Sequence, residues 1–580
     1  MVVTKKMCEK LPLLLRRDRD ALQTAMRKQT ARHGGKRMQQ SVYAAALAGF
    51  MLGQPLMAAE PAKVLDEVVV TATRSAEQGR KIPAKVEVIS RQDLALTAGE
   101  TVTEQLKKNA SIDVMEYPGA LAGIGIRGFR PETFGITKHS LVLIDGRPAG
   151  ATNLATILTD SIERIEVLKG PASSLYGAEA MGGVVNIITT KSTGPRTGMA
   201  EIGFGSFGAN AQKAALGGGI GKRLDFDLAA RRFEQADDYA MGNGATRANT
   251  SYRTQNGRLR LGADLGQSWR LDMSGDLYQG RDIETPGDIA AGELKSGRKD
   301  IDRYGLDFTV GGKVGRNHQL SLTGYHTGEE TANFSDYASD YSGWPVVTTV
   351  TVPTFRSTDS ETDWLGLQLK DEYHWQGRRF IAGLDYQDID KESRYYNQDG
   401  TGKKPYSPNE GRTNLAGYLE TVWNLMDDRM TITGGGRYDT FAVATKATPL
   451  KSDFVPKSED FAAFSPRAGL NYLFDQGFRL HTTVGKGFVP PSAWQLAGYS
   501  QGTSGITRGN PNLKAESSVT YDVGLGYELA ELGLAMDLTY FHTDVDDKIS
   551  TVTNGAVSTF ENSLSAEMGG LETMFSFDNF

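Results

Sequence analysis

The most informative segment of this 580-residue chain lies at residues 162–190 and reads IERIEVLKGPASSLYGAEAMGGVVNIITT. Apolar and charged residues alternate from Ile162 to Leu168, and β-branched residues dominate from Val184 to Thr189, so each end predicts a β-strand. Between them, glycines at positions 170, 177, 182 and 183 allow tight turns and close approach of the backbone to its neighbours. The segment therefore predicts two strands joined by a compact turn region inside a packed domain.

The residues around this segment predict a small α/β domain. Val86–Ile89 has the pattern of a short strand, and Ser90 follows it in the position of a helix N-cap. A second helix is predicted from Glu100 to Lys108, and a buried strand from Leu141 to Ile144 that ends at the turn pair Asp145-Gly146. About 110 residues with this apolar content can enclose a small core.

The hydrophobic pattern changes to a period of two from about Met199 onward. Leu224–Leu228, Leu365–Leu369 and Leu534–Leu538 are examples of this alternation. Alternating segments of about ten residues, separated by short turns and longer polar loops, are typical of a transmembrane β-barrel. A soluble β-sandwich or propeller is the alternative, but about 380 residues is too long for one sandwich and no 40-residue blade repeat is present. We also expect aromatic girdles at the membrane interfaces, formed by Trp269, Tyr278, Tyr325, Trp375, Tyr438, Phe441, Tyr540 and Phe541.

Composition and the N-terminal region narrow the protein class further. The formal net charge is −6 without a basic block, which argues against nucleic-acid binding, and no apolar run of about 18 residues follows the N-terminal region, which argues against a helical membrane protein. Lys36-Arg37, the apolar stretch Val42–Met57 and the small residues Ala58-Ala59 predict a secretory signal peptide cleaved after residue 59. Cleavage there would remove Cys8, the chain's one cysteine. Met38 is an alternative start, and export follows in both cases.

A short extended run, DEVVVTAT, stands at residues 66–73 in a polar setting. Its three consecutive valines favour a β-strand. An isolated strand exposes backbone groups that can pair with the sheet edge of a partner protein. The alternative is that this run is simply the first strand of the following domain.

Residues 162–190 resemble the plug domain of the TonB-dependent outer-membrane receptors, and further motifs similar to those of this family follow in the expected order. They are the TonB-box-like Asp66–Ala72, the plug motifs Ile126–Phe129 and Leu143–Pro148, and the barrel boxes Phe488–Leu496 and Asn510–Glu516. The resemblance runs from about residue 66 to the end of the chain and is more specific in the plug than in the barrel.

The resemblance implies a fold with four parts. Residues 1–59 are the leader and signal peptide, 60–80 the TonB-box segment, 81–195 the plug domain, and 196–580 an incomplete transmembrane β-barrel. The fold class is an all-β transmembrane barrel plugged by a small N-terminal α/β domain. Plugged transporters have 22 strands, whereas the alternating segments here number about 16–18.

The C-terminal residues do not have the pattern of a last barrel strand. Leu571, Thr573, Phe575 and Phe577 set the outward phase, and Phe580 falls on the opposite parity. The pair at 578–579 has the composition of a turn. Since an open barrel would leave an unpaired edge in lipid, we expect the sequence to be C-terminally truncated and to lack several strands.

The resemblance also implies energy-coupled transport rather than enzymatic activity. The TonB complex of the inner membrane would bind Asp66, Glu67, Val68, Val69, Val70, Thr71 and Ala72 and displace the plug. Glu163, Arg164 and Glu166 either pair with charges on the barrel wall or form a solvated strand face. The glycine pattern at 123–128 formally matches a dinucleotide fingerprint, but Pro118 before it and Pro131 after it do not fit the strand–turn–helix that such a fingerprint requires. We expect no cofactor and no catalytic residues.

We expect the ligand to lie where the plug apex and the extracellular loops converge. Aromatic and cationic side chains there suit an anionic, aromatic ferric siderophore, whereas cobalamin or haem receptors of the same family, or a passive channel or surface-binding barrel, are the alternatives. The seven histidines show no metal-ligand spacing, and none lies between Phe488 and Asn510, which weakens the case for haem. The candidate ligand residues are Tyr117, Arg130 and Phe134 in the plug, Tyr337, Tyr341 and Trp344 in one loop, and Tyr396, Lys403 and Tyr406 in another, where Tyr395, Lys404 and Arg412 are neighbours.

Overall fold

A computed structural model describes most of the chain after the leader. The described residues are 69–70, 73–97, 101–109, 111–117, 119, 121–133, 135–159, 161–286, 297–340, 348–502, 505–529 and 532–577. The predicted signal peptide and five of the seven TonB-box residues lie outside them. None of the helices in the described part of the chain has both the length and the apolar character to cross a bilayer.

The plug is an α/β domain built around a five-stranded sheet. The strand order is β3 (Val86–Ser90), β8 (Ile162–Lys169), β9 (Gly183–Thr189), β6 (Ser140–Ile144) and β7 (Arg147–Pro148). Only β6 and β9 are parallel among these described pairs. A separate hairpin joins β4 (Ile112–Tyr117) to β5 (Leu121–Ile126), and the helices are α3 (Arg91–Leu96), α4 (Val102–Leu106) and α5 (Ser173–Tyr176), with a 3-10 turn at Leu154–Thr156.

The predicted elements of the plug are confirmed with small shifts at their ends. Ser90 caps α3 through a capping box with Asp93. Thr101 caps α4 in the same way, so this helix begins at Val102, two residues later than predicted. Residues 162–190 form β8, α5 and β9, and Ile165, Val167 and Val185 of the two strands are fully buried. The core of the plug is therefore assembled around this segment.

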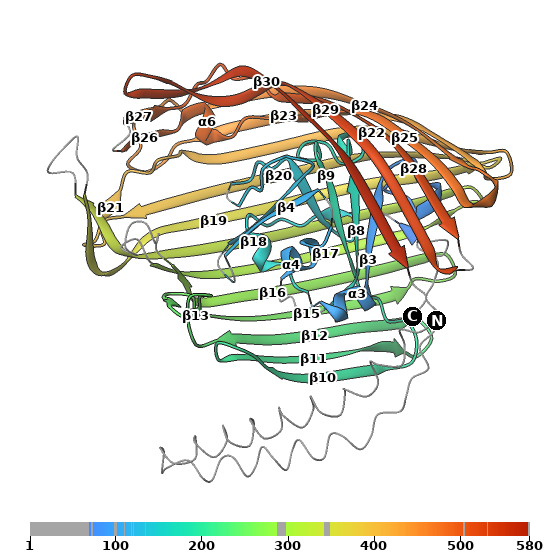
Figure 1. Ribbon diagram of the computed structural model, residues 1–580, viewed down its shortest axis with the longest axis horizontal. Coiled ribbons are helices and arrows are strands. Elements are labelled where there is room, and N and C mark those ends of the chain that lie inside the picture. Colours follow the sequence, from blue (N-terminus) through green and yellow to red (C-terminus); the bar gives the residue numbers. More distant parts are fainter. Residues whose placement is uncertain are drawn as a thin grey trace, which may run out of the picture. The chain divides into compact units, whose positions relative to one another are not determined.

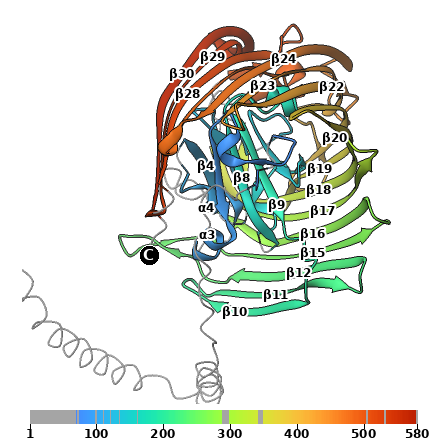
Figure 2. The ribbon, with the colours of Figure 1, turned by 90° about the vertical axis from the view of Figure 1, so that its right-hand side faces the viewer.

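The barrel wall is one sheet that contains nineteen strands in the described residues, and its long neighbouring strands pair antiparallel. Figures 1 and 2 show this sheet curling around the elements of the plug. Its strands are β10 (Thr197–Phe204), β11 (Ala209–Ile220), β12 (Leu224–Gln235), β15 (Tyr252–Asp264), β16 (Trp269–Thr285), β17 (Gly297–Val314), β18 (His318–Asp340), β19 (Thr348–Trp375), β20 (Arg378–Tyr396), β21 (Gly402–Lys403), β22 (Asn409–Leu425), β23 (Met430–Lys446), β24 (Lys457–Leu473), β25 (Phe478–Val489), β26 (Tyr499–Gly502), β27 (Gly505–Arg508), β28 (Glu516–Leu529), β29 (Leu534–Asn554) and β30 (Val557–Phe577).

Three of these strands, β21, β26 and β27, have only two to four residues and belong to connections, which leaves sixteen long strands, 19 − 3, in the described residues. This agrees with the 16–18 strands expected from the alternating segments. Short turns such as 315–317 and 376–377 join strands at one end of the wall, and long connections such as 397–408 and 490–515 join them at the other. In transmembrane barrels the short turns are periplasmic and the long loops extracellular. We call these two ends the turn end and the loop end.

Side chains alternate between the outer and the inner face of the wall, as predicted. On β19, Leu365 and Leu367 are about half exposed, whereas Thr362 and Trp364 are buried. On β30, Leu571, Phe575 and Phe577 are exposed and Glu572 is 2% exposed, which confirms the outward phase expected for these residues. Residues 578–580, and with them the predicted turn and Phe580, lie outside the described residues.

The aromatic residues predicted to form interfacial girdles fall into two groups, of which one faces outward as a girdle requires and the other does not. Trp375, Tyr438 and Tyr540 are exposed on the outer face. The side chains of Tyr278, Tyr325, Phe441 and Phe541 are buried instead on the inner face. The physical reason is parity: Tyr278 follows the outward-facing Leu277 by one residue and therefore points to the lumen.

Candidate functional site

The plug is held in the lumen by buried ion pairs, and the first of them involves Arg74, which lies two residues after the TonB box at 66–72. Arg74 Nη2 lies 2.6 Å from Asp385 Oδ2 on β20, and Nη1 donates to the hydroxyl of Tyr418 at 3.1 Å. Its guanidinium also lies between two rings, 4.6 Å from the centroid of Tyr176 in α5 and 4.4 Å from that of Tyr418. Burial by itself lowers the pKa of Arg74, but the attraction of Asp385 outweighs this effect and raises the pKa. Arg74 is therefore a fixed cation that connects plug and wall.

The residues next to Arg74 are fixed to the same part of the wall. Lys370 on β19 donates to the carbonyl of Arg74 at 2.8 Å, and Arg379 on β20 donates to Ser75 Oγ at 2.9 Å and to the carbonyl of Ala76 at 3.0 Å. Arg379 also forms an ion pair with Glu77. Residues 74–77 thus cannot leave the lumen without breaking several polar contacts at once.

Within the TonB box at residues 66–72, the structure describes β1 (Val69–Val70). The two valines pair antiparallel with β2 (Glu77–Gln78), which is followed by a 3-10 turn at Gly79–Lys81. Lys81 reaches Asp428 in the turn between β22 and β23 at 3.0 Å, which places this region at the turn end. The strand expected at the box therefore exists at Val69–Val70 and folds back on its own chain, whereas Asp66, Glu67, Val68, Thr71 and Ala72 lie outside the described residues.

A second group of ion pairs surrounds Arg127 of the Ile126–Phe129 motif. Arg127 pairs with Asp522 on β28 at 2.8 Å and with Glu572 on β30 at 2.9 Å, and its guanidinium stacks over Phe541 at 4.6 Å. All three charged side chains are at most 1% exposed. Lys169 at the end of β8 lies 3.8 Å from Glu572. Gly170 has φ +96°, and a Cβ there would lie 2.7 Å from Asp522 Oδ2, so this contact requires glycine.

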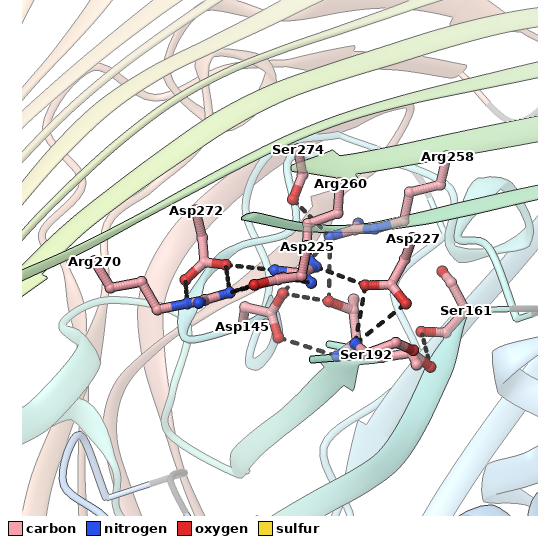
Figure 3. Close-up of polar contacts among 12 residues, drawn as sticks. Asp145, Ser161, Ser192, Asp225, Asp227, Arg258, Arg260, Arg270, Asp272 and Ser274 are labelled. Carbon is pink, nitrogen blue, oxygen red and sulfur yellow. Dashed lines mark hydrogen bonds and ion pairs between the residues drawn. The ribbon is translucent and has the colours of Figure 1, made fainter. Parts of the chain in front are cut away.

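A third group fixes the C-terminal end of the plug to β12, β15 and β16 (Figure 3). Arg260 Nε pairs with Asp227 at 2.7 Å, and the backbone N–H of Ser192, three residues after the end of β9, donates to the same carboxylate at 3.1 Å. Arg258 contacts Thr189 Oγ1 at 3.2 Å, and Thr189 also donates to Asp145 at 2.6 Å. The strand β9 and the segment after it are therefore bound to the wall beside the covalent junction.

The charged residues singled out on β8 form ion pairs within the plug. Arg164 pairs with Glu166 at 2.7 Å, and Glu163 with Arg91 at 3.2 Å, both within the plug. Other charged residues of the plug contact the wall, and of these Arg147 lies in the motif Leu143–Pro148 and Glu179 in the segment 162–190. The contacts are Lys85 with Asp537 at 2.8 Å, Arg147 with Asp307 at 3.0 Å, and Glu179 with Arg412.

His139 connects the plug to the wall at the loop end. Its Nδ1 lies 2.6 Å from Glu132 of the plug and its Nε2 lies 2.9 Å from Glu516, the first residue of β28. The imidazole stacks on Phe129 with a centroid distance of 5.3 Å. Burial opposes the charge of His139, but hydrogen bonds to the two carboxylates raise its pKa to about 9. His139 is therefore a cation at neutral pH.

A small cavity lies between the plug apex and β19–β20. It has a volume of about 50 Å³ and is lined by Lys138 and Glu179 of the plug and by Trp364 and Ile389 of the wall, among others. Burial lowers the pKa of Lys138 to about 8, although Glu132 and Glu179 oppose the shift. Among the described residues, no three His, Cys, Asp or Glu side chains are arranged to hold a metal ion.

The structure describes some of the candidate ligand residues and not others. Tyr117 and Arg130 have exposed side chains in the plug, and Tyr337 is half-buried on β18. The ring of Tyr406 packs edge-on against Tyr395 at a centroid distance of 5.5 Å. The remaining candidates Phe134, Tyr341 and Trp344 lie outside the described residues.

The loop from 397 to 408 brings aromatic and cationic side chains together with a second loop. Lys404 Nζ lies 4.7 Å from the ring centroid of Tyr499, and the carbonyl of Tyr406 accepts the N–H of Tyr499 at 2.9 Å. Lys403 is exposed. Tyr395, Lys404, Tyr406 and Tyr499 form what we call the aromatic–lysine cluster.

Two candidates of this region have other roles. Tyr396 belongs to the outer face of β20, because it shares the parity of the exposed Leu384 and Tyr386, and its hydroxyl donates to Asp359 at 2.8 Å. Arg412 is 3% exposed and pairs with Glu179 of the plug. Lys391 is the residue that sequence reasoning missed here: it shares the inward parity of Ile389, and strand alternation on β20 was the signal that could have found it.

Two family models of known proteins match the plug and the wall. A family model described as "TonB dependent receptor-like, beta-barrel" matches residues 237–578, and one described as "TonB-dependent Receptor Plug Domain" matches residues 78–184. The vitamin B12 transporter BtuB of Vibrio vulnificus (strain CMCP6) is 26% identical over 557 residues, which cover 92% of this chain and 79% of that protein. An iron-regulated outer membrane virulence protein of Vibrio cholerae serotype O1 is 25% identical over 555 residues, covering 87% and 72% of the two chains.

Solved structures share the fold at lower identity. The Serratia marcescens hemophore receptor HasR aligns with a TM-score of 0.67 at 17% identity, over 86% of this chain and 80% of that one. The Pseudomonas aeruginosa protein FpvA, solved with a pyoverdine–iron complex, aligns with a TM-score of 0.68 at 17% identity, over 87% and 70% of the two chains.

Proposed function

The chain belongs to the TonB-dependent receptor family, and we propose that it imports a ferric siderophore across the outer membrane with energy supplied by the TonB complex of the inner membrane. The family consists of outer-membrane transport receptors of Gram-negative bacteria and not of enzymes, which agrees with the expectation that the chain has no catalytic site. In this proposal TonB binds residues 66–72, pulls the segment toward the periplasm and displaces the plug.

The contacts of Arg74 are the observation that most directly supports energy coupling. Arg74 lies two residues after Ala72 and joins Asp385 and Tyr418 of the wall to Tyr176 of the plug. A pull on the TonB-box segment would therefore act on both the plug and the wall through one side chain. A passive channel would require neither this segment nor the plug that it contacts.

The aromatic–lysine cluster supports a siderophore as the ligand. The ammonium of Lys404 and the rings of Tyr395, Tyr406 and Tyr499 present cation–π and stacking surfaces at the loop end. Lys391 faces inward on β20 below them, and Arg130 is exposed on the plug. Such a set favours a ligand that is both anionic and aromatic. Tyr117, Tyr337 and Lys403 complete the residues that we propose as ligand contacts, whereas the outward placement of Tyr396 removes it from the set.

Cobalamin is the second candidate. The identity to a vitamin B12 transporter, 26%, differs by one percentage point from the 25% identity to the iron-regulated outer membrane virulence protein, so sequence similarity does not rank the two ligands. The resemblance to the hemophore receptor is one of fold alone, at 17% identity.

Energy coupling is tested by replacing residues 66–72 with seven alternating Gly and Ser residues, which keeps the length of the segment. Uptake of ⁵⁵Fe-labelled siderophore into cells should fall to background because the replaced segment no longer offers a strand to TonB. Binding of the same ferric siderophore to purified receptor should be unchanged. Uptake that continues at the wild-type rate would contradict energy coupling.

Ligand class is tested by binding measured as quenching of intrinsic tryptophan fluorescence. The probes are ferric enterobactin as a catecholate, ferrichrome as a hydroxamate, cyanocobalamin and haemin. We expect a ferric siderophore to bind most tightly and Lys404→Gln to weaken that binding roughly two- to fivefold, because one partly exposed cation–π contact contributes about 0.5–1 kcal/mol. Lys457→Gln is the matched control, because Lys457 is an exposed lysine at the start of β24 that pairs with Glu459 of the same strand. Preferential binding of cyanocobalamin would favour the second candidate.

A further inference from the structure

Glu516 uses its two carboxylate oxygens to join two different parts of the molecule. Oε2 lies 2.9 Å from Nε2 of His139 in the plug, and Oε1 accepts the backbone N–H of Ile549 on β29 at 2.9 Å. The carboxylate is 5% exposed and the imidazole 15% exposed. A single side chain of the wall therefore contacts the plug on one side and the extracellular part of β29 on the other.

Ile549 lies in an irregular part of the β29–β30 hairpin. The register shifts between Val545 and Lys548 and again between Lys548 and Ile549, and Asp547 has φ +53°. A bulge leaves backbone groups without partners in the ladder, so they need acceptors from elsewhere. Glu516 supplies the acceptor for the N–H of Ile549. Asn562 supports the same bulge by donating to the carbonyl of Asp547 at 2.7 Å.

The bulged part of the hairpin is also bound to the long connection between β25 and β28. Strand β27 pairs in parallel with the start of β30, Ile506 opposite Val557, and Asn510 donates to the carbonyl of Phe560 at 2.8 Å. The helix α6 (Ala493–Ala497) of the same connection packs on Phe560 through Leu496 and Trp494. We call residues 546–562 the strap, because they connect Glu516 to these extracellular elements.

We propose that His139 and Glu516 couple the position of the plug to the order of the strap, so that displacement of the plug loosens the extracellular loops bound to it. This inference rests on the proposed function in one respect, namely that the plug moves during transport.

The direction of the coupling follows from the charges at the contact. His139 belongs to the plug and Glu516 to the wall, so any displacement of the plug apex separates them. Glu516 would then be a buried carboxylate whose one remaining contact in the described residues is the N–H of Ile549, and an uncompensated buried charge is strongly unfavourable. The carboxylate is expected to turn toward water or toward Lys548, whose charge acts on it already. Ile549 then loses its acceptor, and the bulge loses one of the contacts that hold it.

The test is amide hydrogen exchange of the purified receptor at pH 7, measured without ligand and without TonB. His139→Gln removes the cation and keeps a polar side chain, and Glu516→Ala removes both contacts. Glu516→Gln keeps an oxygen for Ile549 but removes the charge that attracts His139. We expect roughly tenfold faster exchange in residues 546–562 for His139→Gln and Glu516→Ala, since a hydrogen bond to a charged group is among the stronger ones in proteins, and a smaller effect for Glu516→Gln.

Lys85→Gln is the matched control, because it breaks a different ion pair between plug and wall. Lys85 contacts Asp537 near the turn end of β29 at 2.8 Å, so its loss loosens the plug without touching the strap. Exchange in residues 546–562 should stay within twofold of the wild type. The proposal is overturned if Glu516→Ala accelerates exchange and His139→Gln does not, because the strap would then depend on Glu516 alone. It is also overturned if Lys85→Gln accelerates exchange as much as His139→Gln, or if exchange rises equally in β20 and β23, because the effect would then be general loosening.

The two proposals fail separately. The exchange measurement requires no transport, so a negative result leaves siderophore uptake and its dependence on residues 66–72 unaffected. If the import proposal were disproved, the measured exchange of the strap would still stand, and only the role of the coupling in transport would be lost.

Discussion

Replacing Arg74 by glutamine should release the segment that follows the TonB box from the lumen. Arg74 is one partner of a buried ion pair with Asp385, and removing one partner of such a pair costs about 3–5 kcal/mol. Arg437 also pairs with Asp385 and still compensates part of its charge, so the lower end of this range applies. Loss of the stacking against Tyr176 and Tyr418 adds on the order of 1 kcal/mol. The total of about 4 kcal/mol corresponds to a factor of roughly 1,000 between the docked and the released segment.

The assay is amide hydrogen exchange of residues 73–78, whose protection should fall by about two to three orders of magnitude. Lys81→Gln is the control within the same region, because its partner Asp428 is 60% exposed and such a pair contributes about 0.2–1 kcal/mol, or at most roughly fivefold in exchange. Arg74→Lys keeps the charge without the planar fork and should be intermediate. The reasoning is refuted if Arg74→Gln and Lys81→Gln change the exchange of these residues by the same factor within threefold.

Two further predictions concern the docked plug. Because the folded protein raises the pKa of His139 from its ordinary 6.5 to about 9, the stability that its charge contributes is complete below about pH 6.5 and is lost as the pH rises through 9. The difference in the free energy of unfolding between the wild type and His139→Gln, on the order of 3 kcal/mol at most, should therefore shrink between about pH 6.5 and 10 when it is followed by thermal unfolding, and a constant difference would speak against the cationic imidazole. Gly177 has φ +79°, and a Cβ there would lie 2.9 Å from Arg437 Nε and Asp439 Oδ1, whereas Gly146 has φ +86° and no atom within 4 Å of such a Cβ. In thermal unfolding, Gly177→Ala should therefore destabilise the protein by about 1–3 kcal/mol more than Gly146→Ala, and equal effects would show that the contact with the wall is not close.

Local regularities made much of the fold accessible from the sequence. The strands β8 and β9 could be predicted because their apolar residues recur with a period of two, and Gly170 and Gly177 could be singled out because glycine at such positions tolerates a positive φ. The outward phase of Leu571, Phe575 and Phe577 could be predicted for the same reason. These features depend on neighbours in the chain.

The contacts between plug and wall could not be predicted in this way. Arg127 was within a motif, but its partners Asp522 and Glu572 lie 395 and 445 residues further along the chain. Arg164 and Glu166 had the more conspicuous pattern, yet they pair with each other inside the plug. Charged residues occur at many inward positions of the wall, and their sequence context does not say which of them the plug will meet.

The sequence alone determined the family, the strand pattern of the wall and the compact segment at the centre of the plug, because each follows from short-range periodicity and from motifs a few residues long. Only the tertiary structure decided that Arg74 inserts between Tyr176 and Tyr418, that Tyr395 faces inward while Tyr396 faces outward, and that Glu516 joins His139 to Ile549. The physical reason is register: one residue of shift along a strand moves a side chain from the lumen to the outer face, and that shift is set by pairing between strands far apart in the chain.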